Sequence, residues 1–138
     1  MSKEDCIFCK IANGVIPSAT VYEDSICRVI LDINPASKGH ALIIPKEPFD
    51  NVYSMDADTA SKIFTIATEV AKAQKAELNP DGLNIIQNNG EAAGQTVFHF
   101  HMHLVPRYIN DTVNVTWKPG EADKTELEAL SKALRKRI

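Results

Sequence analysis

The amino-acid sequence predicts an α+β fold in a single domain that spans residues 1–138. Three observations carry this prediction. Five short segments have the composition or alternation of β-strands, one long segment between the third and fourth has helical periodicity, and no β-α-β repeat is present. A chain of this length buries roughly two-thirds of its extended surface, which is enough for one core.

The strands are expected between turn residues. The first two are separated by Asp24-Ser25 and therefore predict a hairpin, and the third ends at Pro45. The last segment alternates between apolar residues and histidines, which is the period of a strand with two different faces. The five predicted strands cover residues 20–23, 26–31, 40–44, 82–87 and 97–105.

One long helix is expected over residues 58–78, where apolar side chains recur at helical spacing and Asp56 or Asp58 is available as the N-cap. Shorter helices are expected over residues 6–11 and 125–137. These helices are segregated from the strands, which favours α+β over a parallel sheet.

Composition excludes several classes of function. The net charge of −3 and the pI of about 5.8 leave no basic stripe for tracking phosphates, so no nucleic acid is expected as a partner. No apolar run approaches the ~20 residues of a membrane helix, and no apolar signal-peptide region follows Met1, so we expect a cytoplasmic protein and no membrane partner. Three cysteines in such a chain indicate free thiols or a metal site rather than disulfides.

The histidines carry the strongest chemical signal. Of the four in the chain, His99, His101 and His103 occupy alternate positions, which on a strand puts their side chains on one face. Phe100, Met102 and Leu104 then point into the core. Two chemistries remain open from this pattern: a metal ion held by the three histidines with an open coordination position, or one histidine acting as nucleophile or acid–base while the others orient it.

The segment just before the histidines predicts an anion-binding loop. Residues 88–97 are rich in small residues, and Gly90 and Gly94 allow backbone N–H groups to turn toward a bound phosphate. Asn88, Gln95 and Thr96 add side-chain hydrogen-bond donors. A loop of this kind beside a nucleophile favours phosphate chemistry.

A known pattern matches these residues. The motif HFHMHLV at residues 99–105, preceded by AGQTV at residues 93–97, resembles the signature of the histidine triad family of nucleotide hydrolases and transferases. The resemblance extends to CIFCKI at residues 6–11, LDINP at residues 31–35 and GHALIIPK at residues 39–46, and covers most of the chain up to residue 107. It is strongest for the small bacterial proteins of the branch that includes purine nucleoside phosphoramidases.

The resemblance implies a five-stranded antiparallel sheet with one long helix, and a homodimer whose sheets join into a ten-stranded one. It implies that the middle histidine, here His101, attacks the α-phosphate of a purine nucleotide to give a nucleotidyl-histidine intermediate that water hydrolyses. His103 would bond the phosphate or a nearby backbone group. His99 and His40 would hold the tautomer and the ring orientation of His101.

Substrate contacts are implied in the same way. At the phosphate they are Asn88, the Gly94 backbone and Thr96, and at the ribose the carboxylate of Asp32. Around the base they are Phe8, Ile11 and Ile33, and Trp117 would reach the active site of the partner subunit. The tail, residues 108–138, is expected to be partly mobile or to lie at the dimer interface.

The resemblance also bears on metals. Similar bacterial proteins hold zinc with a Cys-x-x-Cys pair, the first triad histidine and a second histidine at the position where this chain has Pro48. Cys6, Cys9 and His99 supply only three ligands, whereas structural zinc almost always takes four. We therefore expect two buried thiols rather than zinc, and no required cofactor.

Alternatives to an adenosine phosphoramidase remain. A dinucleoside polyphosphate presents the same α-phosphate to His101, so it is the second candidate substrate. A metallohydrolase with His99, His101 and His103 as ligands, and a nucleotide-binding scaffold protein with weak catalysis, are the other two hypotheses.

Overall fold

The computed structural model describes residues 5–138 and contains a five-stranded antiparallel sheet with three α-helices. This confirms the predicted α+β class and the antiparallel sheet, and most boundaries lie within two residues of those expected. The strands are β1 (Thr20–Glu23), β2 (Cys27–Leu31), β3 (Ala41–Pro45), β4 (Gly82–Ile86) and β5 (Met102–Arg107), and the helices are α1 (Ile7–Ala12), α2 (Ala57–Leu78) and α3 (Lys124–Arg135). Two 3-10 turns, η1 (Val52–Ser54) and η2 (Glu91–Ala93), lie in the connections.

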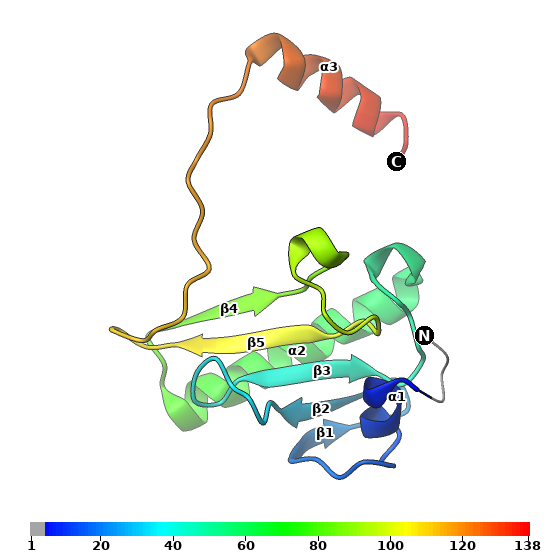
Figure 1. Cartoon of the computed structure of the whole chain (residues 1–138), viewed down its shortest axis with the longest axis vertical. Helices are drawn as coiled ribbons and strands as arrows, with labels where there is room; N and C mark the ends of the chain where they lie inside the picture. The colour runs from blue at the N-terminus through cyan, green and yellow to red at the C-terminus, as the bar shows by residue number, and fades with distance from the viewer. Residues whose placement is uncertain (1–4) are drawn as a thin grey trace.

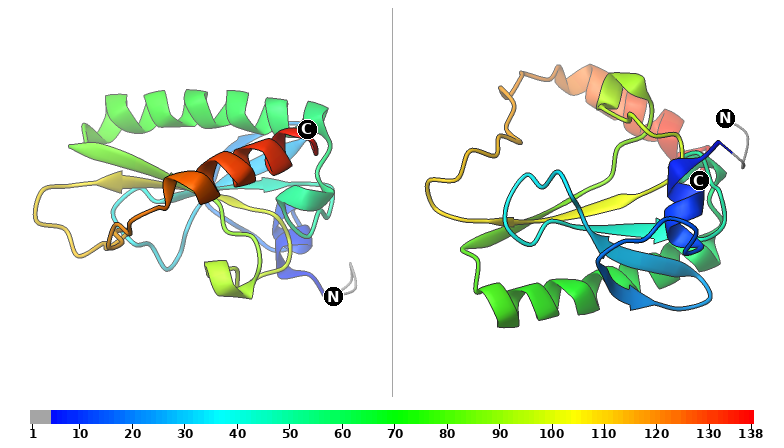
Figure 2. Two further views of the ribbon diagram at one scale, coloured as in Figure 1. Left: turned by 90° about the horizontal axis from the view of Figure 1, so that it is seen from above. Right: turned by 60° about the horizontal axis from the view of Figure 1, so that its bottom comes forward.

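The sheet has the order β1-β2-β3-β5-β4, so the last strand in sequence is inserted between β3 and β4. Helix α2 crosses one face of the sheet, whereas α1 and η2 lie on the other side (Figures 1 and 2). The insertion of β5 brings the histidine segment beside β3, which follows the only other histidine of the chain.

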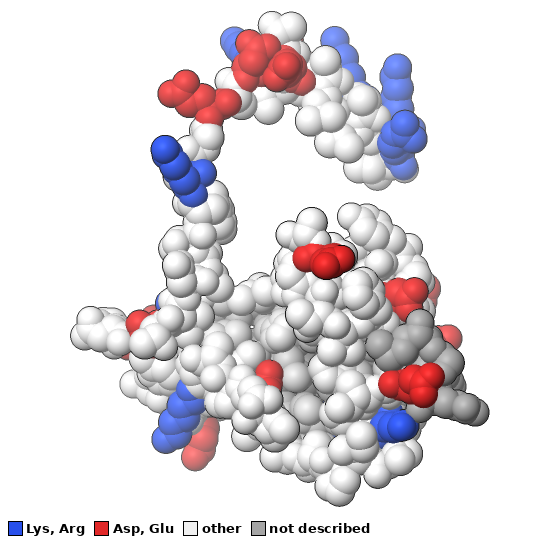
Figure 3. Space-filling model, viewed as in Figure 1, with Lys and Arg blue, Asp and Glu red and all other residues white. Residues whose placement is uncertain are grey.

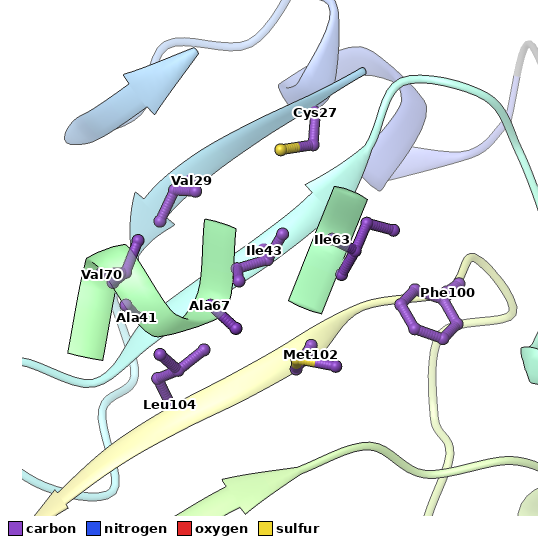
Figure 4. Close-up of a cluster of buried hydrophobic side chains, with 10 residues drawn as sticks. All are labelled: Cys27, Val29, Ala41, Ile43, Ile63, Ala67, Val70, Phe100, Met102 and Leu104. Carbon is purple, nitrogen blue, oxygen red and sulfur yellow. The ribbon is translucent and has the colours of Figure 1, made fainter. Parts of the chain in front are cut away.

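The main core lies between the sheet and α2 (Figure 4). Ile63, Ala67 and Val70 recur at helical spacing and are buried against the sheet, as their periodicity predicts. From β5 and the segment before it, Phe100, Met102 and Leu104 join the same cluster, so the alternation of the last segment does point one set of side chains into the core, as predicted.

The two ends of α2 have clear causes. Asp56 is the N-cap, and its carboxylate accepts a hydrogen bond from the Thr59 N–H at 2.9 Å. Asn79 ends the helix in the left-handed conformation (φ 45°). Near this end Leu78 packs so closely on Gly39 (φ +87°) that a Cβ there would overlap it. Glycine at position 39 thus allows the chain to pass close to the C-terminal end of α2 just before His40.

The predicted start of the last strand is wrong. We expected a strand over residues 97–105, but β5 begins at Met102, so only His103 of the three alternating histidines lies in it. The ladder with β3 pairs Ile43 with Met102 and stops before Pro45. Proline has no N–H to donate, and the Pro45 carbonyl accepts a hydrogen bond from the His99 side chain instead of from a backbone N–H.

Beyond β5 the chain leaves the sheet. Arg107 binds both carboxylate oxygens of Asp111 at 2.9 Å and the Asn84 side chain at 2.7 Å, which fixes the exit at the β4 edge. An extended segment then carries α3 away from the sheet (Figure 1), and every residue of α3 is exposed. Acidic side chains gather at the start of α3 and basic ones toward its end (Figure 3). None of the described helices is long and apolar enough to cross a membrane.

Candidate functional site

All four histidines come together on the side of the sheet opposite α2. His40 precedes β3, His103 lies in β5, and His99 and His101 lie in the segment leading into β5. The rings of His40 and His103 are 5.2 Å apart, and those of His101 and His103 are 5.0 Å apart. His40, His99 and His101 are each less than a tenth exposed. The cluster predicted from the sequence therefore forms.

The proton positions on His40 and His103 follow from their hydrogen-bond partners. His40 Nδ1 accepts a hydrogen bond from the Ala36 N–H at 3.0 Å, so neutral His40 carries its proton on Nε2. That nitrogen lies 2.9 Å from His103 Nδ1 and donates to it. Neutral His103 therefore carries its own proton on Nε2.

The proton position on His101 is set by the backbone. His101 Nδ1 lies 2.8 Å from the carbonyl oxygen of His99, which can only accept, so this nitrogen carries the proton. The Nε2 lone pair is then unprotonated, and no described residue hydrogen-bonds it. The ring packs edge-on against Phe8 at 4.7 Å. In its neutral form the middle histidine is thus fixed in one tautomer, with the lone pair on Nε2.

Burial favours the neutral form of these histidines. It lowers the pKa of His40, His99 and His101 below the ordinary value of 6.5, and for each of them burial outweighs the partners that raise it. The pKa of His103 falls to about 4, because burial is reinforced by the neighbouring His101 and His40. The Asp32 carboxylate acts in the opposite direction on His103, His101 and His40.

His99 connects the cluster to helix α1. Its Nε2 donates to the Pro45 carbonyl at 2.8 Å, which leaves a lone pair on Nδ1. The Cys6 and Cys9 sulfurs both lie 3.3 Å from that nitrogen, and all three residues are buried. Cys6 is also the N-cap of α1 and accepts from the Cys9 N–H at 3.2 Å. The sequence did not reveal the roles of Ala36 and Pro45, because both act through backbone groups.

The 88–97 loop turns at its two glycines, as predicted, but one of its side chains does not have the predicted role. Gly90 (φ +89°) and Gly94 (φ +93°) both require the left-handed half of conformational space, which glycine tolerates. Gln95 was expected to offer donors to a ligand, but its amide accepts from the Gly90 N–H at 2.8 Å and donates to the carbonyls of Asp50 and Val97. The side chain is 3% exposed and shapes the loop from inside.

The remaining donors of the loop stay available. A Cβ on Gly94 would lie 3.6 Å from Asn88 Nδ2, so the Asn88 amide closes over the glycine turn. Thr96 is exposed. Asn88, Gly94 and Thr96 thus remain the candidate phosphate contacts.

The residues expected to contact the ribose and the base differ in their exposure and in their neighbours. Asp32 Oδ2 is 3.7 Å from His40 Nε2, and Oδ1 accepts from the Asn34 N–H at 2.8 Å, which places the carboxylate beside the histidines. Phe8 and Ile11 are partly buried on α1. Ile33 is 88% exposed, and Trp117, in the segment between β5 and α3, is 83% exposed.

Two groups of side chains in the described residues lie close enough to hold a metal ion. They are Cys6, Cys9 and His99, and Asp32, His40 and His103, each with ligand atoms within 4.8 Å of one another. His99, His101 and His103 do not form such a group, since His99 Nδ1 faces the thiols and His101 Nδ1 is bonded to a carbonyl. The geometry therefore contradicts the three-histidine metal hypothesis.

Comparison with known proteins identifies the family to which the chain belongs. The family model of the HIT domain matches residues 13–110. The chain belongs to the HIT family. It is 45% identical over 138 residues to Protein hit of Bacillus subtilis, covering 98% of this chain and 95% of that protein.

Two further comparisons extend the likeness within the HIT family. The chain is 35% identical over 134 residues to adenosine 5'-monophosphoramidase hnt1 of Schizosaccharomyces pombe, covering 96% of this chain and 98% of that protein. A crystal structure of a HIT family protein from Bacillus anthracis has a TM-score of 0.92 and 43% identity and covers 98% of both chains.

A zinc-bound HIT family protein from Mycobacterium smegmatis matches with a TM-score of 0.76 and 35% identity, over 96% of this chain and 99% of that one. In the present chain Cys6, Cys9 and His99 lie close enough to hold a metal, and the lone pair on His99 Nδ1, which faces the two sulfurs, suits a ligand. No fourth histidine, cysteine or carboxylate of the described residues joins them. The residues therefore do not complete a closed, four-ligand structural zinc site.

Proposed function

We propose that this HIT family chain is a nucleotide hydrolase that releases AMP from an adenosine 5'-phosphoramidate. The observation that carries the proposal is the single neutral tautomer of His101, which leaves Nε2 free as a nucleophile in the segment that follows the 88–97 loop. Similarity to a protein named adenosine 5'-monophosphoramidase supports a hydrolase role and this choice of substrate.

In the proposed reaction His101 Nε2 attacks the α-phosphorus. An N–P bond forms as the bond to the leaving amine breaks, and the amine departs with a proton taken from solvent. Water then attacks the same phosphorus and returns one proton to solvent, the bond to His101 breaks, and AMP and the neutral imidazole are released. Backbone N–H groups near Gly94, together with Asn88 and Thr96, stabilise the charge on the phosphate oxygens.

The other residues position this chemistry. His103 presents its Nε2–H while its Nδ1 is held by His40. We propose that Asp32 accepts hydrogen bonds from the ribose hydroxyls and that Phe8, Ile11 and Ile33 contact the base. The protein is expected to act in the cytoplasm, on a purine nucleotide rather than on a nucleic acid or a membrane.

The test is release of AMP from adenosine 5'-phosphoramidate by the purified protein, with and without a chelator. We expect turnover that the chelator does not change, because no described step needs a metal ion. Diadenosine polyphosphate, assayed in parallel, tests the second candidate substrate. Loss of activity with the chelator would favour a metallohydrolase with Asp32, His40 and His103 as metal ligands. Tight AMP binding with no turnover would favour a scaffold protein.

We also propose that the chain forms a homodimer. Strand β4 is an edge of the sheet with Ile85 42% exposed, and α3 exposes Leu127, Leu130 and Leu134 by 54–57% on one side. A helix of this length is marginal alone in water, so its leucines are expected to pack on the second copy.

The dimer proposal predicts a sedimenting mass twice the 15.2 kDa of one chain. Replacing the three leucines of α3 by serine should weaken association by at least about tenfold, because apolar surface that the second copy covers is lost. Lys124→Ser in the same helix is the matched control and should leave association unchanged. A monomer at tens of micromolar would contradict the proposal.

A further inference from the structure

The two thiols of α1 lie in direct contact with the histidine cluster but have no part in the proposed reaction. Cys6 and Cys9 are 5% and 4% exposed, and both sulfurs lie 3.3 Å from His99 Nδ1. The ligand atoms of the three residues all lie within 4.8 Å of one another. The two sulfurs are thus close together, and both contact His99 Nδ1.

Two contacts connect these thiols to the nucleophile. The His99 carbonyl accepts the hydrogen bond that fixes the tautomer of His101, at 2.8 Å. Phe8, which lies between the two cysteines in sequence, packs edge-on against both His101 (4.7 Å) and His99 (6.3 Å). A change in the Cys6–Cys9 segment therefore reaches His101 by two routes.

We propose that Cys6 and Cys9 are an oxidation site, at which formation of a reversible disulfide lowers the activity of His101. The proposal rests on the proposed function. It accounts for a Cys-x-x-Cys pair that meets a histidine without a fourth ligand to complete a closed zinc site.

The oxidant is a hydroperoxide. One cysteine sulfur attacks a peroxide oxygen, the O–O bond breaks, and a sulfenic acid and one water (or alcohol) are formed. The second sulfur attacks the sulfenic sulfur, the S–S bond forms, and a second water leaves. The two thiols lose two electrons and two protons in total, and both electrons reduce the peroxide. Thiol reductants reverse the step by exchange.

Access to the buried sulfurs comes from the nature of α1. It is a helix of only six residues, and Ile7, between the cysteines, is 49% exposed. A helix this short depends on packing for its stability, so local opening is expected well below the free energy of global unfolding.

The disulfide is expected to disturb the site because its geometry differs from that of the two thiols. The two sulfurs must approach to about 2.05 Å of each other. This shifts the backbone of the segment that joins the two cysteines, and Phe8 moves with it. The oxidised pair has no S–H left to donate, so the buried Nδ1 of His99 loses its donors. Both changes act on the ring orientation of His101. We therefore expect kcat to fall by about tenfold with a smaller change in KM, as for misplacement of a reacting group.

The experiment treats the whole protein, with its zinc content measured beforehand, with hydrogen peroxide and follows two readouts. One is the mass of the tryptic peptide of residues 4–10, which contains both cysteines and should lose about 2 Da, the two thiol hydrogens. The other is AMP release from the phosphoramidate. Both should return to their initial values with dithiothreitol.

Variants separate this site from other thiols. Cys6→Ser and Cys9→Ser should each lose the dithiothreitol-reversible inhibition. Cys27→Ala is the matched control and should keep it, because Cys27 is fully buried in the core and burial raises the pKa of its thiol to about 12, which keeps it unreactive.

The two proposals fail in different ways. The proposed oxidation site is wrong if the mass of peptide 4–10 does not change at peroxide concentrations that oxidise a model dithiol peptide. This holds whether or not the protein contains zinc. A disulfide that forms without altering kcat would overturn its coupling to His101. If the reduced protein releases no AMP from any substrate, the proposed function is wrong. The coupling is then tested by measuring the affinity of the reduced and oxidised forms for AMP by calorimetry instead of by turnover.

Discussion

Replacing His101 by glycine is expected to lower kcat for phosphoramidate hydrolysis by at least about 10³-fold, with little change in the affinity for AMP. The reason is geometric. His101 and His103 each have a ring nitrogen without a hydrogen-bond partner in the described residues, but that of His103 carries a proton, whereas that of His101 offers a lone pair because its other nitrogen donates to the His99 carbonyl. Removing the ring removes the atom that forms the covalent intermediate and leaves the rest of the site in place.

Two measurements check that the loss is chemical. Quenching the wild-type reaction with alkaline denaturant, in which a histidine N–P bond is stable, should trap a protein adduct heavier by one adenylyl group, and His101→Gly should show none. Added imidazole should restore part of the activity of His101→Gly, because it fits the space left by the ring. His103→Gln, which keeps His101, should form the adduct but not respond to imidazole. Substantial activity in His101→Gly without imidazole would refute the assignment of the nucleophile.

Much of the fold was predictable because it depends on local periodicity. The spacing of Ile63, Ala67 and Val70 predicted α2 and its buried face, and the alternation of Phe100, Met102 and Leu104 predicted the core side of the last segment. The start of β5 was not predictable from the segment itself. It depends on Pro45 in a different strand, whose missing N–H ends the ladder.

The candidate site was predictable as a set of residue types, but not as a network. The pairing of His40 with His103 joins residues 63 apart in sequence, and the tautomers depend on backbone groups of Ala36, Pro45 and His99 that carry no side-chain signal. Gln95 was misjudged for the same reason. A glutamine beside two glycines looks like a ligand donor until the carbonyls that it bonds inside the protein are known.

The stability of the protein is expected to fall as the pH is lowered from 6.5 to 5, before most carboxylates titrate. In the unfolded chain a histidine binds a proton near pH 6.5, whereas burial lowers the pKa of folded His103 to about 4. Between these values the unfolded state binds more protons, so the free energy of unfolding rises with pH and is lost as the pH falls. Even after allowance for partial solvent exposure, His103 alone should contribute about 1–2 kcal/mol over this interval.

Urea unfolding at pH 7.5, 6.5, 5.8 and 5.0 measures this dependence. His103→Gln removes one titrating group, so its free energy of unfolding should depend less steeply on pH than that of the wild type, whatever its absolute stability. His40, His99 and His101 have pKa values lowered in the same direction and should account for the slope that remains. Stability that is constant or rises toward pH 5 would mean that the histidines are charged in the folded protein. That outcome would also remove the neutral nucleophile on which the proposed reaction depends, so the same titration tests the electrostatics of the fold and the chemistry of the site.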